Sequence, residues 1–416
     1  MESIMKTTLK KLISLLLALA MALALTACAQ NSPAASDPTA VPAVAPTTAP
    51  TAAPEATPEP SDDDVDGELI VDYEEEFEYA ELLTMTHYKG GYTSFTVSGM
   101  ENEFLLVPEG KSVPQDLNEN VTVLQQPINR TCFNSASLVS LVDAIGGLDN
   151  IATVGVTLEK WYLPNVIEKM ESEEIKYSGS FSAPDFEMLI SEGVQLELDT
   201  SMLNSKVEVI AKYEELGIPY IIDPSSSESH PLARVEWVKL LGAIFDLEEN
   251  AATFFEEQKA KVDAVSNLES TGKTMASFFI SNDQVGIRNG QDYIKKMVDL
   301  AGAEYVPADF YPDENSYTKV SFEEFYSACK DADYLLYSVF TFPYGSIEGM
   351  IEYNELFADF KAVQEGNVYY TVSYLSQATS SIAGVIEDIN TILNDPTIES
   401  TDTVFKVPAT APATAE

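Results

Sequence analysis

The chain has 416 residues, of which 45% are hydrophobic, enough for two or three domains with a sizeable core. Its 67 acidic side chains against 23 Lys and Arg give a formal net charge of −44. That charge argues against binding to nucleic acid or to an anionic membrane surface, because both need basic patches. Three widely spaced cysteines and two histidines exclude a zinc-finger pattern, a C-x-x-C redox pair and a three-histidine metal site.

Residues 1–28 predict an export signal. Three lysines precede an apolar run at 12–25, which is shorter than the ~18–20 residues that a membrane-spanning helix needs. The run ends in Leu-Thr-Ala-Cys at Cys28, which resembles the bacterial lipobox, whose cysteine is acylated and becomes the first residue of the mature protein. We therefore predict a lipoprotein signal. An ordinary signal peptide with a chance cysteine, or a buried helix, is the alternative.

The next segment, residues 29–64, consists almost entirely of Ala, Pro, Thr, Ser and acidic residues. Such a composition cannot bury a core, so we expect a disordered spacer, partly in the polyproline II conformation. We expect a second flexible segment at the tail, 397–416. Between 65 and 117, alternating runs flank the pair Gly90 and Gly91, which predicts a small antiparallel β extension with a hairpin turn.

Strands alternate with helices through the rest of the chain, which predicts βαβ units in two α/β lobes, 118–230 and 271–396. In the first lobe we expect strands at 121–124, 151–156, 194–198 and 220–222, and helices at 135–145, 186–191 and 207–216. In the second we expect strands at 275–280, 334–339 and 368–372, and helices at 293–300, 322–329 and 382–393. The sheets should be mostly parallel.

One internal match favours two similar lobes over one large sheet. The segment 186–191 precedes the apolar residues 196–198, and the segment 322–327 precedes 334–336. Each is a predicted helix that opens with Phe-Glu and leads into a buried strand.

A connector, 231–270, lies between the lobes, with an unbroken helical pattern from Leu232 to about Leu268. Pro231 suits a first helical position. Asp246 and Glu249 form a capping-box-like restart inside the pattern. A helical connector predicts a stiff pair of lobes with limited closure, because a helix cannot absorb a large dihedral change.

This order of elements resembles the iron-complex/vitamin B12 type (class III, helical-backbone) of substrate-binding lipoproteins of bacterial ABC importers. Residues 134–151 look like that family's first helix, turn and second strand, and 228–237 look like the lead into its connecting helix. The resemblance covers roughly 118–394. The chain departs from it at 130–133, Arg-Thr-Cys-Phe, where many relatives have an apolar strand, which leaves the ligand contacts of that loop open.

The resemblance implies an α/β fold of two Rossmann-like lobes joined by a long connecting helix. It also implies a monomeric, non-enzymatic receptor without a cofactor, anchored by its lipid to the outer face of the bacterial cytoplasmic membrane. The receptor would carry a ferric siderophore, haem or cobalamin to an ABC permease dimer and its ATPase. The chain has no Walker A motif of its own.

In this family a Glu on each lobe pairs with Arg residues of the permease, and Glu187 and Glu323 occupy the matching positions. They are the same two residues that open the repeated helices. Two carboxylates on opposite lobes suit a symmetric basic dimer. The alternative is that each Glu is favoured only by the dipole at a helix N-terminus.

A ligand of such a fold lies where the carboxyl ends of the strands of both lobes meet. The residues expected there are aromatic, hydroxyl, amide or basic: Asn134, Ser135, Trp161, Tyr162, Ser180, Phe181, Ser201, Ser226, His230, Arg288, Tyr311, Tyr344 and Tyr374. Flat rings offer contact area at low entropy cost, and hydroxyls fix orientation. About half of these aromatics are expected to be ordinary packing.

Two of these residues have open assignments. Arg288 either pairs with a ligand carboxylate or phosphate, or pairs with the neighbouring Asp292. His230 either ligates a haem iron or is a helix-entry residue before Pro231. No direct metal ligand is assigned otherwise.

Two other classes compete with a solute receptor. A secreted, lipid-anchored α/β hydrolase would need a triad, but the chain has no G-x-S-x-G motif, and only His87 and His230 could act as its base. A surface receptor or adhesin could use the same bilobal fold, because fold alone does not decide function.

Overall fold

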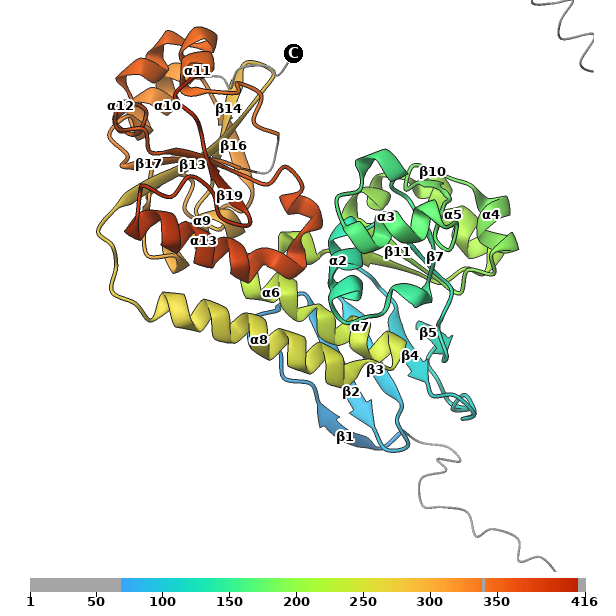
Figure 1. Cartoon of the computed structure of the whole chain (residues 1–416). Helices are drawn as coiled ribbons and strands as arrows, with labels where there is room; N and C mark the ends of the chain where they lie inside the picture. Colours follow the sequence, from blue (N-terminus) through green and yellow to red (C-terminus); the bar gives the residue numbers. More distant parts are fainter. Residues whose placement is uncertain (1–68, 339–340, 411–416) are drawn as a thin grey trace, which may run out of the picture. The chain divides into compact units, whose positions relative to one another are not determined.

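A computed structural model of the chain describes residues 69–338 and 341–410, which all fall in one compact unit (Figure 1). The predicted signal peptide, Cys28 and the predicted spacer lie outside the described residues. None of the described helices is long and apolar enough to cross a bilayer.

The N-terminal extension is a five-stranded sheet in the order β1-β2-β3-β4-β5. Its strands are β1 (Val71–Glu74), β2 (Leu83–Tyr88), β3 (Thr93–Val97), β4 (Glu103–Val107) and β5 (Val121–Gln125). The first four strands are antiparallel, but β5 pairs with β4 in parallel. The predictions of a purely antiparallel extension ending at 117, and of 121–124 as a first-lobe strand, were wrong. Alternation reveals that a strand exists but not which strand it pairs with.

The first lobe contains a five-stranded parallel sheet in the order β12-β11-β6-β7-β8. Its strands are β6 (Thr131–Phe133), β7 (Ile151–Val154), β8 (Lys176–Tyr177), β11 (Leu196–Thr200) and β12 (Tyr220–Asp223). Its helices are α2 (Ala136–Ala144), α3 (Pro164–Glu171), α4 (Phe186–Ser191) and α5 (Val207–Leu216). The short hairpin β9 (Gly179–Ser180) and β10 (Ala183–Pro184) precedes α4. Side chains that alternate along β6 face opposite layers, with Cys132 under α5 and Phe133 toward the main core.

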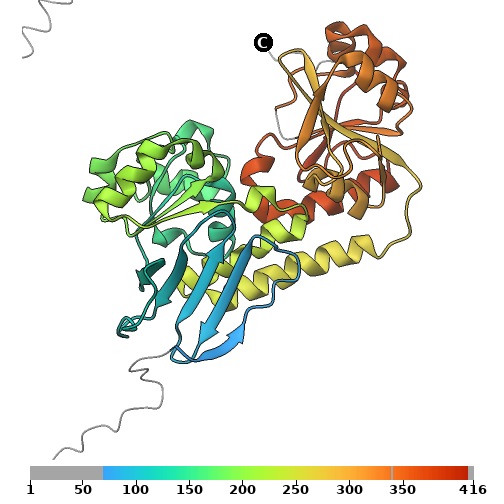
Figure 2. The same ribbon diagram turned by 180° about the vertical axis from the view of Figure 1, so that it is seen from behind.

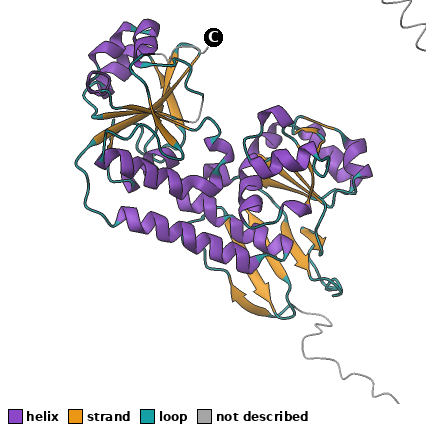
Figure 3. Ribbon diagram, viewed as in Figure 1, coloured by secondary structure: helices purple, strands orange, loops and turns teal. Residues whose placement is uncertain are grey.

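The second lobe contains a seven-stranded sheet with the path β16-β14-β13-β17-β18-β19, and β15 also pairs with β13. Its strands are β13 (Thr274–Ser281), β14 (Gln284–Arg288), β15 (Glu304–Tyr305), β16 (Tyr317–Val320), β17 (Tyr334–Tyr337), β18 (Val368–Thr371) and β19 (Val404–Lys406). Its helices are α9 (Tyr293–Leu300), α10 (Phe322–Cys329), α11 (Ile347–Tyr353), α12 (Lys361–Glu365) and α13 (Ile382–Asn394). Helices lie on both sides of its strands (Figure 3).

Two lobes with separate sheets confirm the predicted α/β fold. The second sheet is more mixed than expected, because β14, β16 and β19 run antiparallel to their neighbours. The prediction of a flexible tail from 397 was wrong for β19, whose residue Val404 is fully buried. The tail's Ala-Pro-Thr composition starts only after this strand.

Three helices make up the connector: α6 (Pro231–Glu236), α7 (Val238–Phe245) and α8 (Glu248–Ser266). The prediction of an unbroken helix was therefore wrong. The chain breaks at Trp237 and again at Asp246, whose φ of 60° is left-handed and ends α7. The predicted capping box does not form, because Leu247 is the N-cap of α8. Pro231 takes the first helical position as predicted.

Two buried carboxylates attach the N-terminal extension to the connector, where the sheet lies beside α7 and α8 (Figures 1 and 2). The Glu236 carboxylate accepts hydrogen bonds from the backbone N–H groups of residues 78–80 at 2.8–2.9 Å. The Glu228 carboxylate accepts those of residues 81–82 at 3.0–3.2 Å. Lys239 Nζ lies 3.2 Å from the Glu236 carboxylate and compensates its charge. The extension is thus held by charge-assisted hydrogen bonds as well as by apolar packing.

We expect Glu236→Ala to lower the free energy of unfolding by about 3 kcal/mol, because it leaves three backbone N–H groups and Lys239 without their buried acceptor. Urea denaturation measures this loss, and limited proteolysis should cut residues 69–125 first. Glu249→Ala, on the exposed side of α8, is the matched control and should change little. Equal stability of the two variants would contradict the assignment.

Candidate functional site

Side chains from both lobes meet at a contact region that we call the seam. The Asn315 amide donates to the Ser227 carbonyl at 2.8 Å. The rings of Tyr162 and Tyr374 stack with centroids 5.0 Å apart, so the structure brings these two candidate residues together. Beside them, Gln377 Nε2 donates to the Lys160 carbonyl at 2.9 Å.

The first-lobe side of the seam is built from the end of β12 and the start of α2. Ser135, the N-cap of α2, donates from its hydroxyl to the Asp223 carboxylate at 2.5 Å. The other Asp223 oxygen accepts the Ser225 N–H at 2.8 Å. Burial raises the pKa of Asp223, against the opposing effect of these hydrogen bonds.

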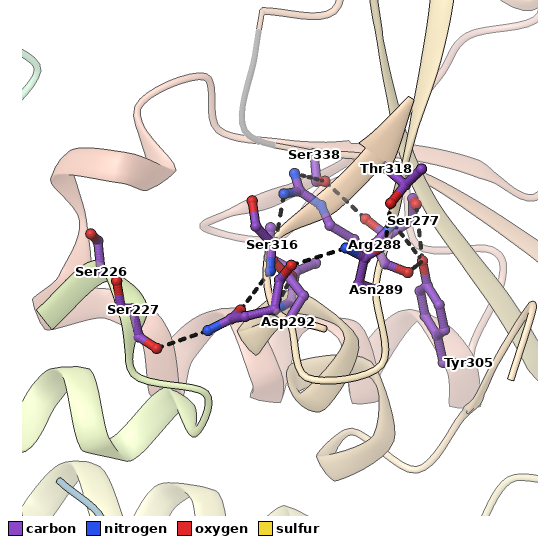
Figure 4. A network of polar contacts seen from close by, with 12 residues as sticks. Ser226, Ser227, Ser277, Arg288, Asn289, Asp292, Tyr305, Ser316, Thr318 and Ser338 are labelled. Atoms are coloured by element: carbon purple, nitrogen blue, oxygen red, sulfur yellow. Dashed lines mark hydrogen bonds and ion pairs between the residues drawn. The ribbon is translucent and has the colours of Figure 1, made fainter. Parts of the chain in front are cut away.

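On the second-lobe side, Arg288 ends β14 and is 5% exposed. Its Nη2 donates to the Ser338 hydroxyl at 3.3 Å, and its Nη1 lies 3.7 Å from the Asp292 carboxylate (Figure 4). The sequence analysis gave pairing with Asp292 as one of two alternatives for Arg288. The structure contains this contact, although it is longer than a direct hydrogen bond. The Arg288 Nε is buried and has no hydrogen-bond partner among the described residues.

Arg234, on α6, supplies a second guanidinium that the sequence analysis did not select. Its Nε donates to the Glu228 carbonyl at 3.1 Å, and its Nη2 donates to the Ser226 carbonyl. Its guanidinium carbon lies 3.5 Å from the ring centroid of Tyr293, a close cation–π contact. Arg234 lies within the segment 228–237 that carries the family resemblance, so that motif was the available signal.

The buried charges alternate in sign across the seam. Burial raises the pKa of Asp292, and Arg288 and Arg234 oppose that shift. Burial lowers the pKa of Arg234, which Asp292 and Asp223 oppose. The two arginines therefore each face an acid, and the Nε of Arg288 is a buried donor without an acceptor among the described residues.

The other expected wall residues fall into exposed and buried sets. Tyr162 and Tyr311 are each 47% exposed, and Ser201 and Ser226 are exposed too. Ser180, Phe181 and Tyr344 are partly exposed, with Tyr344 in an aromatic cluster beside Tyr337 and Tyr353. Trp161 is instead a core side chain, 4% exposed, whose indole N–H donates to the Val156 carbonyl at 3.0 Å. A pair of adjacent aromatics does not reveal which of its rings turns inward.

Asn134 is also buried, and its side-chain amide makes its hydrogen bonds within the first lobe. Its Nδ2 donates to the Glu197 carboxylate at 2.7 Å and to the Asp199 carboxylate at 3.1 Å. The sequence analysis selected Asn134 as a ligand contact and missed the two acids, although both stand on a predicted strand.

His230 is the N-cap of α6, and its Nδ1 accepts the Leu232 N–H at 3.2 Å, which confirms the helix-entry interpretation. Its ring stacks on Tyr79 with centroids 4.5 Å apart. It lines a hollow of about 300 Å³ together with Tyr79 and Lys296. Burial, reinforced by Lys296, lowers the pKa of His230 to about 4.

The contacts of the two histidine rings can be compared with those in a catalytic triad. Within residues 69–338 and 341–410, no serine hydroxyl bonds to either ring. His87 Nδ1 lies 3.1 Å from the Thr93 hydroxyl and its Nε2 lies 3.6 Å from Glu75, but Thr93 is only 5% exposed. The same described residues hold no cluster of three or more His, Cys, Asp or Glu side chains arranged to bind a metal ion.

Glu187 and Glu323 are exposed at the second positions of α4 and α10. Asp185 caps α4 by accepting the Met188 N–H. Ser321 and Glu324 form a capping box on α10. Among the described residues neither Glu187 nor Glu323 has an ion pair or side-chain hydrogen bond, so both carboxylates are left to solvent.

Residues 200–375 match the family model described as periplasmic binding protein. This segment, which runs from the end of β11 into the second lobe, is similar to that family. An ABC transporter substrate-binding protein of Listeria monocytogenes aligns over 64% of this chain and 99% of its own, with a TM-score of 0.50 and 18% identity. The periplasmic haem-binding protein HutB of Vibrio cholerae aligns over 64% and 98%, with a TM-score of 0.53 and 16% identity.

A curated relative, an uncharacterized lipoprotein (MJ0878) of Methanocaldococcus jannaschii, is 26% identical over 320 residues. The match covers 73% of this chain and 75% of the relative. The family match and the structural likeness confirm the class III binding-protein fold that the sequence analysis inferred.

We expect the His230 imidazole to stay neutral down to about pH 4. Because its folded pKa lies below the ordinary 6.5, this group stabilises the fold fully above pH 6.5 and loses that contribution as the pH falls toward 4. NMR titration measures the pKa directly, and His230→Asn, which keeps an N-cap acceptor, assigns the signal. A signal that titrates near 6.5 and disappears in His230→Asn would contradict the placement.

Proposed function

We propose that the protein is an extracytoplasmic receptor of an ABC importer that binds an iron complex, either a ferric siderophore or haem, or a cobalamin-like ligand at the seam. It would act as a monomer, anchored through Cys28 to the outer face of the bacterial cytoplasmic membrane. It would deliver its ligand to a permease dimer driven by an ATPase. The binding-protein fold supports the general role, and HutB, which has this fold, is a haem-binding protein.

The observation that carries the proposal is the buried guanidinium of Arg288. A buried cation with an unsatisfied donor favours a ligand that brings an anionic oxygen, because the new hydrogen bond is charge-assisted. Haem propionates, siderophore catecholates and the phosphodiester of cobalamin all supply such oxygens. The exposed face of the Tyr162–Tyr374 stack offers a flat apolar surface for the rest of the molecule.

The net charge of −44 would repel an anion in bulk solvent, so the seam has to overcome it locally. Arg234 and Arg288 do so from positions where solvent screens their charges weakly. The acids that face them keep each guanidinium stable in the absence of ligand.

We expect Arg288→Gln to weaken binding of the anionic ligand by about 10-fold or more, since a charge-assisted hydrogen bond is lost. The probes are haem, a ferric catecholate siderophore and cobalamin, screened by the rise in melting temperature that each produces. Arg130→Gln, a variant of an exposed arginine at the far end of β6, should bind as the wild type does. Equal affinity of Arg288→Gln and wild type would remove the seam arginine from the site.

We propose further that Glu187 and Glu323 dock the lobes on the permease. Support comes from their equivalent, exposed positions at the starts of α4 and α10, and from the separate caps that these helices already have. The alternative is that each Glu only interacts with the dipole at the N-terminus of its helix. That role does not explain why both carboxylates lack an ion pair or a hydrogen bond among the described residues.

The double variant Glu187→Ala, Glu323→Ala should keep ligand affinity and lose most ligand uptake by cells, because it removes the carboxylates that pair with permease arginines. Uptake of radiolabelled ligand measures the effect. The double variant Glu208→Ala, Glu348→Ala changes one exposed helix-start acid in each lobe and is the matched control. Normal uptake by the Glu187, Glu323 variant would refute the docking assignment.

A further inference from the structure

Glu197 and Asp199 form a buried acid pair in the first lobe. Side chains alternate along β11, so Leu196 and Leu198 face the main core while both acids face the opposite layer under α5. That layer is otherwise apolar and contains Leu189, Leu203, Val209, Ile218 and Ile222. Glu197 and Asp199 are both completely buried.

The pair has polar neighbours but no cation. Asn134 Nδ2 bridges the two carboxylates, donating one N–H to each. Asp199 also accepts the backbone N–H of Thr200 at 2.7 Å. The other polar side chains near the pair are neutral hydroxyls and a thiol, from β6, β7, the turn after β8 and α5: Cys132, Thr153, Ser178 and Tyr213. Burial raises the pKa of the Cys132 thiol and of the Tyr213 hydroxyl, so both stay protonated near neutral pH.

Several oxygens around the pair are left without partners. The second oxygen of Glu197, the Thr153 hydroxyl and the Tyr213 hydroxyl are all buried and have no hydrogen-bond partner among the described residues. A carboxylate that keeps its charge in such a place costs more than one that holds a proton, because burial in an apolar layer disfavours the charged form. Burial, reinforced by Asp199, raises the pKa of Glu197 to about 8, and burial raises that of Asp199 to about 7.

The pair sits directly behind residues expected to line the ligand site. The backbone N–H groups of Asn134 and Ser135 both donate to the Leu198 carbonyl, which lies between the two acids in sequence. The helical turn η3 (Ser201–Ser205) follows immediately after β11. We call Asn134, Ser135 and η3 the first-lobe edge.

The Asn134 bridge is tightly fitted. A Cβ on Gly155, the residue after β7, would lie only 1.6 Å from Asn134 Oδ1. Glycine at this position therefore makes room for the amide that joins the two acids.

We propose that Glu197 and Asp199 are both protonated while the first-lobe edge is packed, and that loss of these protons above neutral pH loosens the edge. The two groups are protonated more readily in the folded chain than in the unfolded one. Their contribution to stability is therefore complete at low pH and is lost as the pH rises through about 7 to 8. Two negative charges side by side in an apolar layer would then push α5 and η3 off the strand.

The first test compares thermal unfolding at pH 6 and pH 9 for the whole chain without ligand. The wild type should lose about 5 °C or more of melting temperature over this interval relative to the double variant Glu197→Gln, Asp199→Asn, whose isosteric amides cannot ionise. Glu208→Gln, on the exposed side of α5, is the control and should follow the wild type. Parallel curves for the wild type and the double variant would overturn the proposal.

The second test needs no variant. Hydrogen exchange of the wild type should show protection falling at residues 134–138 and 201–205 between pH 7 and pH 9, after correction for the intrinsic rate, while α13 stays protected. Unchanged protection at these residues would overturn the proposal. Because neither test uses a ligand, both outcomes are independent of whether the proposed transport function holds.

Discussion

The hydrogen bonds and the cation–π contact made by residues 228–236 hold the three parts of the molecule together. Within these few residues, the Glu228 and Glu236 carboxylates bind the backbone of the N-terminal extension. Arg234, between them, reaches the second lobe through the ring of Tyr293 and returns to the first lobe through the Ser226 carbonyl. Such charge-assisted bonds are directional, so they set the positions of the parts more sharply than apolar packing alone would. The seam is therefore assembled by the same short segment that attaches the extension.

The charges of the molecule are distributed in two ways. Acidic residues far outnumber basic residues in the sequence, 67 against 23, which gives the net charge of −44. Buried charges at the seam instead alternate, with Asp223 and Asp292 facing Arg234 and Arg288. The net charge argues against partners that bind a large part of the surface, such as nucleic acid or an anionic membrane. It does not describe a buried site, whose own charges act over a short distance.

The sequence predicted the regular elements well where periodicity alone decides them. The helices α5, α9 and α10 begin and end at the predicted residues, because each shows one apolar face. Gly217 and Gly302 add a stop signal just after α5 and α9. The partner of β5 and the break at Asp246 could not be predicted, since both depend on contacts with distant residues. The connector breaks where a left-handed residue lets α7 and α8 pack side by side, which a local helical pattern does not reveal.

The candidate site was predicted less completely than the fold. The alternating run Leu-Glu-Leu-Asp in β11 predicts a strand, and its acids would ordinarily face solvent. Here α5 covers them, so a pattern typical of a surface strand conceals a buried polar cluster. Arg288 was selected because basic residues are rare in the predicted loops. Arg234 was missed because it stands inside a helical pattern, where a charged residue usually means a solvent-facing position.

The two lobes share one arrangement of helix and strand, but the side chains at the carboxyl ends of their strands differ in charge. In each, a helix that opens with Phe-Glu leads into a buried strand, β11 in the first lobe and β17 in the second. Near the carboxyl end of β11 the chain places Asp199, whereas directly after β17 it places Ser338, which accepts a hydrogen bond from Arg288. The starts of the helices are thus alike on both lobes and suit a symmetric partner, while the ends of the strands differ and suit an asymmetric ligand. A ligand bound at the seam, as proposed above, would have Asp223 on its first-lobe side and the Arg288 guanidinium on the other, so it would bind in one orientation.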